Sequence, residues 1–180
     1  PAAARLVGNG ADAAAVVNAS GVAGAVLDGV RVQGGTQGGV GGTGSTVTLR
    51  NLMVSNNEAP VGPGRTQAGG ITWRGGRLTA ENLTVTTNTG PSGGLRADGG
   101  AVVDLTGSRL RSNESLGESC STTPAPACLG GGGLSVEGAE VGLDQVTVRD
   151  NTALVGGGVD VRGPGSVLRV VTSEIVHNTA

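Results

Sequence analysis

Two cysteines are the most reactive side chains in this sequence, and their spacing favours a disulfide bond. Cys120 and Cys128 bracket the polar, proline-containing segment Ser-Thr-Thr-Pro-Ala-Pro-Ala. Such a pair is typical of a local disulfide, whereas a redox-active pair more often has the spacing Cys-x-x-Cys. A metal site would need further ligands, and the one histidine, His177, lies far along the chain. The pair therefore predicts an oxidising, extracytoplasmic setting.

Charged residues at matching positions of successive segments form a second candidate site. They occupy alternate positions after glycine pairs: Arg74, Arg96, Asp98, Glu137, Asp160 and Arg162. If the segments stack, Arg74 would lie near Asp98, and Glu137 near Arg162, with each pair contributing about 0.2–1 kcal/mol. One hypothesis is a solvated face of mixed charge. The other is a shallow binding site for a polar polymer such as a glycan.

These charged residues do not match a known catalytic arrangement. Glycoside hydrolysis needs two carboxylates facing a cleft, whereas Asp98, Glu137 and Asp160 each stand alone on their segment beside an arginine. A single histidine and no Ser-His-acid arrangement leave general acid–base chemistry without its usual groups. Two glycine motifs of the dinucleotide-binding kind, starting at Gly8 and Gly39, lack the required strand and helix. We therefore predict no enzyme, no metal site and no cofactor.

An internal repeat supplies the elements that would position these residues. Five segments begin with a glycine pair and end with an asparagine, 19 to 21 positions further on. The five asparagines are Asn57, Asn88, Asn113, Asn151 and Asn178. The distance from an asparagine to the next glycine pair varies from 5 to 19 positions, so variation in length falls at one corner. Coils that stack in register behave in this way.

Apolar residues alternate with polar ones inside every repeat, which is the pattern of half-buried strands. Three short strands per unit predict an all-β parallel β-helix of about six to seven coils. Residues 1–180 form one domain in this interpretation, with five regular repeats over 38–180 and an irregular first coil or cap over 1–26. The sequence ends just after Asn178 without a capping segment, so we expect it to be part of a longer chain or assembly.

The repeated glycines and asparagines are predicted to be structural. Stacked asparagines can form an amide ladder, and asparagine tolerates left-handed backbone angles at a corner. The glycine pairs admit backbone angles that are closed to other residues. Glycine accounts for 36 of the 180 residues and aromatic residues for 1 %, all of it Trp73. We therefore expect a narrow core of small aliphatic side chains, with Trp73 pointing inward.

The pairing of Gly-Gly-[Ile/Leu/Val] with an apolar-x-x-Asn ending resembles the repeats of bacterial polymorphic outer-membrane proteins. Related pectin-lyase-like proteins of bacterial surfaces share this pattern, and the resemblance implies a right-handed β-helix. The opening Val7-Gly8-Asn9-Gly10 and the segment from Leu27 to Gly35 resemble the first coils of such proteins. The ending of the outer-membrane family starts with Phe, whereas this chain has Val54, Val85, Leu110, Val148 and Ile175.

Charge and hydropathy narrow the functional classes further. The net charge is −2 and lysine is absent, which predicts no basic face for a nucleic acid. No apolar run approaches the ~18 residues of a membrane helix. We predict a non-enzymatic, exported structural or adhesive module of a bacterial cell surface, which presents loops 58–68 and 114–131 to a protein or glycan. The alternatives are a carbohydrate-binding or carbohydrate-cleaving β-helix that uses the charged face, and an assembly subunit that stacks end to end by self-association.

Overall fold

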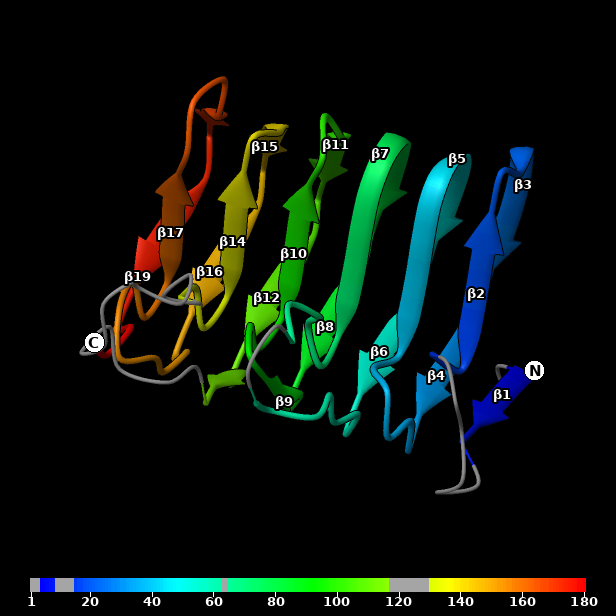
Figure 1. The fold of residues 1–180 in the computed structure, drawn as a ribbon, viewed down its shortest axis with the longest axis horizontal. Coiled ribbons are helices and arrows are strands. Elements are labelled where there is room, and N and C mark those ends of the chain that lie inside the picture. The colour runs from blue at the N-terminus through cyan, green and yellow to red at the C-terminus, as the bar shows by residue number, and fades with distance from the viewer. Residues whose placement is uncertain (1–3, 9–14, 63–64, 117–129) are drawn as a thin grey trace.

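The computed structural model describes residues 4–8, 15–62, 65–116 and 130–180, and these contain strands and no helix (Figure 1). A seven-stranded sheet holds β1 (Ala4–Val7), β4 (Val30–Gln33), β6 (Met53–Ser55), β8 (Thr84–Thr86), β12 (Arg109–Arg111), β16 (Thr147–Arg149) and β19 (Glu174–Val176). Within the described residues, no helix is long and apolar enough to cross a membrane.

A ten-stranded sheet forms the second wall of the molecule. It holds β2 (Val17–Ser20), β3 (Ala23–Asp28), β5 (Val40–Arg50), β7 (Ile71–Glu81), β10 (Leu95–Asp98), β11 (Val102–Thr106), β14 (Leu134–Glu137), β15 (Glu140–Asp144), β17 (Val159–Arg162) and β18 (Val167–Val171). A third, two-stranded sheet holds β9 (Thr89–Gly90) and β13 (Glu114–Ser115).

Each strand pairs with its counterpart in the neighbouring repeat, and every pairing among the described residues is parallel. Val85 of β8, for example, lies opposite Val54 of β6 on one side and Leu110 of β12 on the other. Figure 1 shows these counterparts side by side in chain order, from β1 to β19 along the seven-stranded sheet. The repeat that is visible in the sequence is therefore also the unit of strand pairing.

The core consists of columns of aliphatic side chains between the sheets. One column is fully buried: Val32, Val54, Val85, Leu110 and Val148. Burying a side chain of this size contributes about 1.5–3 kcal/mol. Because alternate residues of a strand point to opposite faces, the apolar positions of the inner repeats reach this interior, whereas Val161, Val170 and Ile175 of the last repeat are exposed.

Trp73 lies in the core between two small residues of the adjoining strands. Its side chain is fully buried, as its position in the alternation predicts. Its partners in the adjoining strands are Gly42 and Ala97, two of the smallest residues. The indole ring therefore fills space that small residues on both sides do not occupy.

The N-terminal segment contains strands, and two strands further along are longer than the sequence predicts. The described part of residues 1–26, predicted to be an irregular first coil or cap, contributes strands β1 and β2 and the start of β3, which pair with β4 and β5. The register of β3 shifts once, between Ala23 and Ala25. In β5 and β7, the first and second strands of the repeat are continuous, and the chain passes through left-handed angles at Gly44 in β5 and at Gly75 and Gly76 in β7.

In three of the glycine pairs, the second glycine has a different role from the predicted one. An added Cβ at Gly70, Gly94 or Gly133 would lie 2.3–2.6 Å from a carbonyl oxygen of the next pair in the stack. None of these three residues has a positive φ. Close approach of successive repeats, and not an unusual backbone angle, therefore requires glycine at these positions.

The left-handed residues lie one position before the asparagine column, so their predicted placement in the column is wrong. The non-glycine residues at this corner have φ between 52° and 54°: Asn56, Thr87, Ser112, Asp150 and His177. A second left-handed corner precedes each strand of the seven-stranded sheet from β4 to β19, for example at Asn51, Asn82 and Thr172. The chain turns at these residues, and the asparagine that follows the first corner can then point inward.

Thr172 is expected to be a strained residue, because β-branched side chains strongly disfavour positive φ. It has φ 47° and is exposed. Thr172→Asn should therefore raise the free energy of unfolding by about 0.5–1 kcal/mol, measured by urea denaturation. The same substitution at Thr79, within strand β7, should lower stability, because asparagine is disfavoured in strands. Equal effects at both positions would contradict the assignment of strain to Thr172.

Candidate functional site

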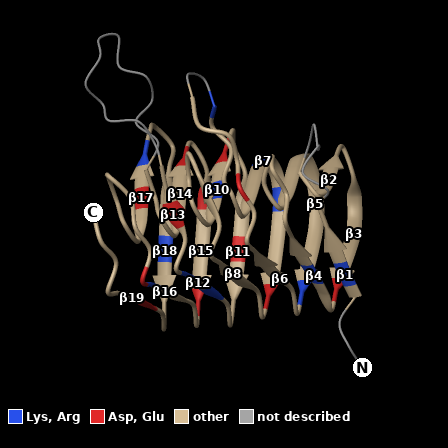
Figure 2. Cartoon of the chain, turned by 90° about the horizontal axis from the view of Figure 1, so that it is seen from below, with Lys and Arg blue, Asp and Glu red and all other residues tan. Residues whose placement is uncertain are grey.

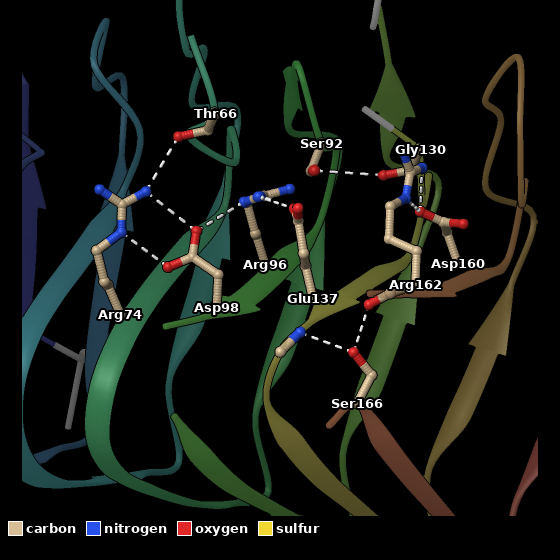
Figure 3. A network of polar contacts seen from close by, with 11 residues as sticks. Thr66, Arg74, Ser92, Arg96, Asp98, Gly130, Glu137, Asp160, Arg162 and Ser166 are labelled. Atoms are coloured by element: carbon tan, nitrogen blue, oxygen red, sulfur yellow. Dashed lines mark hydrogen bonds and ion pairs between the residues drawn. The ribbon is translucent and has the colours of Figure 1, made fainter. Parts of the chain in front are cut away.

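Six charged residues, which we call the charged network, form two groups of ion pairs on the outward face of β7, β10, β14 and β17 (Figure 3). They are the residues predicted as a binding face: Arg74, Arg96, Asp98, Glu137, Asp160 and Arg162. Strand register places four of them in one column, so that Arg74, Asp98, Glu137 and Arg162 succeed one another from strand to strand. The neighbouring column holds Arg96 and Asp160, with Ser135 between them.

Asp98 lies at the centre of this network between two guanidinium groups. Arg74 donates from Nε to Oδ1 at 2.8 Å and from Nη2 to Oδ2 at 3.0 Å. Arg96 donates from Nε to Oδ2 at 3.0 Å. The arrangement contains the Arg74–Asp98 pair expected from strand stacking.

The second expected pair, Glu137 with Arg162, is not among the ion pairs of the described residues. Glu137 instead accepts a hydrogen bond from Nη2 of Arg96, and Arg162 donates to Asp160 on its own strand. The long side chain of Arg96 reaches from the adjacent column to Glu137, and Arg162 then finds its partner two residues away. Strand register alone does not decide between these arrangements.

The centre of the network is buried, so it differs from the solvated face that was one interpretation of the sequence. The side chains of Arg96 and Asp98 are only 3 % and 8 % exposed. Residues 65–68 lie beside this face, where Thr66 Oγ1 accepts from Arg74 and the carbonyl oxygen of Gln67 accepts from the backbone N–H of Ser92. Only the ends of the network, such as Arg74 at 52 % exposed, reach solvent.

Mutual neutralisation makes this burial tolerable, because a buried charge is costly unless it is paired. Burial raises the pKa of Asp98, but hydrogen bonds and attraction from Arg74 and Arg96 outweigh it and hold the pKa below its ordinary value. The hydrogen bond to Asp98 raises the pKa of Arg74. All three carboxylates of the network accept from arginine, which leaves them poorly suited to act as general acids or bases.

The lowered pKa of Asp98 predicts a loss of stability in acid. A carboxyl group with a depressed folded-state pKa stabilises the fold above its unfolded value of about 3.9, and this stabilisation is lost as the pH falls through the folded value. Asp98→Asn should lower the free energy of unfolding by about 2 kcal/mol at pH 7. The difference from the natural chain should shrink between about pH 4 and pH 2, in urea titrations at each pH.

Asp104→Asn is the matched control for this experiment, because Asp104 is 47 % exposed in its pair with Arg77. Its effect at pH 7 should stay below about 1 kcal/mol. A difference between Asp98→Asn and the natural chain that remains constant down to pH 2 would contradict the role assigned to the Asp98 carboxylate.

The asparagine column forms a continuous amide ladder through the stack. Nδ2 of Asn88 donates to Oδ1 of Asn113 at 3.0 Å and to the carbonyl oxygen of Val54 at 3.0 Å. Oδ1 of Asn88 accepts from Nδ2 and from the backbone N–H of Asn57, at 2.9 Å and 3.1 Å. The same pattern continues to Asn151 and Asn178. Asn88 thus uses both donors and both acceptor sites internally, which leaves no capacity for a ligand.

The remaining predicted site residues fall outside the region that the structure describes. Cys120 and Cys128 both lie in 117–129, as does most of the loop 114–131. Among the described residues, no group of three or more His, Cys, Asp or Glu side chains is placed to hold a metal ion.

A basic face on the seven-stranded sheet was missed by the sequence analysis. Five arginines lie in its strands, against the single acidic residue Glu174: Arg5, Arg31, Arg109, Arg111 and Arg149. Figure 2 shows basic residues on the strands of this sheet. The alternation of the third strand of each repeat already places these arginines outward, but the net charge of −2 conceals their segregation to one sheet.

Comparison of the chain with family models, with curated proteins and with solved structures finds no match.

Proposed function

We propose that the parallel strands form a right-handed parallel β-helix of about six to seven coils, related to the pectin-lyase-like repeats of bacterial surface proteins. Two observations support this proposal. Counterpart strands pair in parallel one repeat apart throughout the described chain. The amide ladder runs through five successive repeats at one corner.

We infer that the chain is a non-enzymatic, exported module with a structural or adhesive role at a bacterial cell surface. The observation that carries this inference is that the candidate polar groups bind one another. The carboxylates of the charged network form ion pairs with its arginines, and the amides of the ladder form hydrogen bonds within the stack. What varies between repeats is the loop after each asparagine, above all 58–68 and 114–131. Variable loops on a rigid scaffold commonly carry recognition.

Protease treatment of intact bacteria that express the natural full-length protein tests the surface location. An epitope within this chain should disappear when trypsin is added to whole cells, while a cytoplasmic marker survives. In the same preparation, Cys120 and Cys128 should resist alkylation until a reductant is added. An epitope that is cleaved only after lysis would overturn the proposed location.

Attachment of beads coated with the purified chain tests the adhesive role. Beads should attach to host-cell or bacterial surfaces, and attachment should fall when the exposed loop residues Val61 and Arg65 are both replaced by serine. The matched control replaces another exposed valine and arginine, Val26 and Arg50, by serine. Equal loss from both variants would contradict recognition by loop 58–68.

A further inference from the structure

The arginines of the two sheets differ in whether they form ion pairs. In the ten-stranded sheet, all six arginines form ion pairs with acidic residues: Arg50, Arg74, Arg77, Arg96, Arg162 and Arg169. In the described strands of the seven-stranded sheet, only Arg149 has an ion pair, with its neighbour Asp150 at 3.6 Å. The charge on this second face is therefore largely unneutralised.

Like charges on this face also lie directly opposite one another. Arg111 is the register partner of Arg149, and Arg5 is the partner of Arg31. Arg109 lies two residues from Arg111 on the same outward side of β12. Like charges opposite each other destabilise a sheet. The arginines of the ten-stranded sheet all form ion pairs, whereas the seven-stranded sheet keeps arginines in an unfavourable arrangement. Such a local exception is typical of a binding surface.

The surface around these arginines is shallow and polar. An open depression of about 610 Å³ is lined by Arg109, Arg111 and Arg149, by Thr84 and Thr147, and by Glu174, the one acidic residue in the strands of this sheet. Guanidinium groups bind carboxylate and sulfate in a bidentate manner. Threonine hydroxyls beside them can donate to or accept from the hydroxyl groups of a sugar.

The strip of the basic face that holds Arg109, Arg111 and Arg149 is narrow, and its width limits which anionic partners can bind to it. Strands β12 and β16 have three residues each, so the strip is about 10 Å wide. Acidic residues bound it at both corners, with Asp144 on one side and Asp150 and Glu114 on the other. A nucleic acid duplex would bring its dense phosphates over these acids. A single nucleic acid strand would find no aromatic residue to stack on, since Trp73 is buried.

We propose that this face, centred on Arg109, Arg111 and Arg149, binds a linear acidic polysaccharide. Such a polymer is narrow enough for the strip, and it carries oxyanions for the arginines and hydroxyl groups for the threonines. It would be the ligand of the adhesive module proposed above, so the inference rests on that function. The site lies on a different sheet from the charged network that the sequence suggested for a glycan.

Binding of heparin, hyaluronate and dextran to the complete 180-residue chain tests this assignment. Heparin carries sulfates and carboxylates, hyaluronate carries carboxylates alone, and dextran is neutral. Binding to at least one of the two acidic polymers should be measurable at 50 mM salt and should weaken at least tenfold at 500 mM. Dextran should not bind. Absence of binding to both acidic polymers would overturn the assignment.

A matched pair of triple variants locates the site. Arg109→Gln/Arg111→Gln/Arg149→Gln should raise the Kd for the acidic polymer at least tenfold. Arg50→Gln/Arg77→Gln/Arg169→Gln removes the same charge from exposed arginines of the other sheet and should change the Kd less than twofold. Circular dichroism and the Tm report whether each variant is folded. Equal weakening by both triple variants would show that net charge is responsible, and would overturn the site.

A 20-nucleotide DNA, single-stranded or duplex, is the competing probe. Binding of DNA as tight as that of the polysaccharide would overturn the choice of partner. Failure of every polysaccharide arm would remove this ligand but leave the surface module intact, because the protease experiment on whole cells tests that location independently.

Discussion

Asn88→Ala is expected to lower the free energy of unfolding by about 3–5 kcal/mol, measured by urea denaturation at neutral pH. The substitution removes the acceptor for two buried donors, Nδ2 and the backbone N–H of Asn57. It also removes the donor to the carbonyl oxygen of Val54 and to Oδ1 of Asn113. Each buried donor left without a partner costs about 1–3 kcal/mol. Asn88 is fully buried, so water cannot replace these bonds unless the stack opens.

Asn82→Gly is the control for the loss of an amide in the same repeat. Asn82 also stacks on an asparagine of the preceding repeat, because its Nδ2 donates to Oδ1 of Asn51 at 2.8 Å. This pair is exposed to solvent, and glycine accommodates the positive φ of 51° without strain. The cost should therefore stay below about 1 kcal/mol. Similar losses at Asn88 and Asn82 would show that burial adds nothing to the ladder.

The amide ladder also shows which parts of the fold can be predicted from the sequence. Alternating apolar residues and a recurring asparagine indicate strands and a stacking register, because a side chain pointing inward must meet its counterpart one repeat away. The left-handed corner was misplaced by one residue because its occupants share no residue type: Asn56, Thr87, Ser112, Asp150 and His177. Only the asparagine beside them recurs as a residue type, so the sequence pattern does not indicate the residue that makes the turn.

Strand register alone does not predict which ion pairs form in the charged network. Register places Cβ atoms, but an arginine side chain is long enough to reach either of two columns, as Arg96 does when it binds Glu137. One partner of the network, Thr66, belongs to a loop that follows no period, and its Oγ1 accepts from Arg74. The basic face was predictable in principle, since the outward positions of each third strand can be listed from the alternation. Summing charges over each sheet, and not over the chain, would have identified it.

The contact between Gly42 and Trp73 predicts a strong coupling in the core. An added Cβ at Gly42 would lie 2.1 Å from Cζ3 of the fully buried Trp73 ring, which is far inside van der Waals contact. Gly42→Ala should therefore cost about 3 kcal/mol, at the upper end for an overpacked core. Gly41→Ala is the matched control on the same strand, because its nearest contact would be an ordinary 3.5 Å from Cβ of Ala15. It should cost less than about 0.5 kcal/mol.

Trp73→Val should cost about 3–5 kcal/mol through the cavity that it leaves. The double variant Gly42→Ala/Trp73→Val should be more stable than the sum of the single losses predicts, with a coupling energy of about 2 kcal/mol, because the smaller side chain makes room for the new methyl group. Urea denaturation of all four proteins measures this coupling. Additive losses would mean that the ring moves aside at no cost. The near absence of aromatic residues could then not be attributed to close stacking of the repeats, since a large ring would need no glycine opposite it.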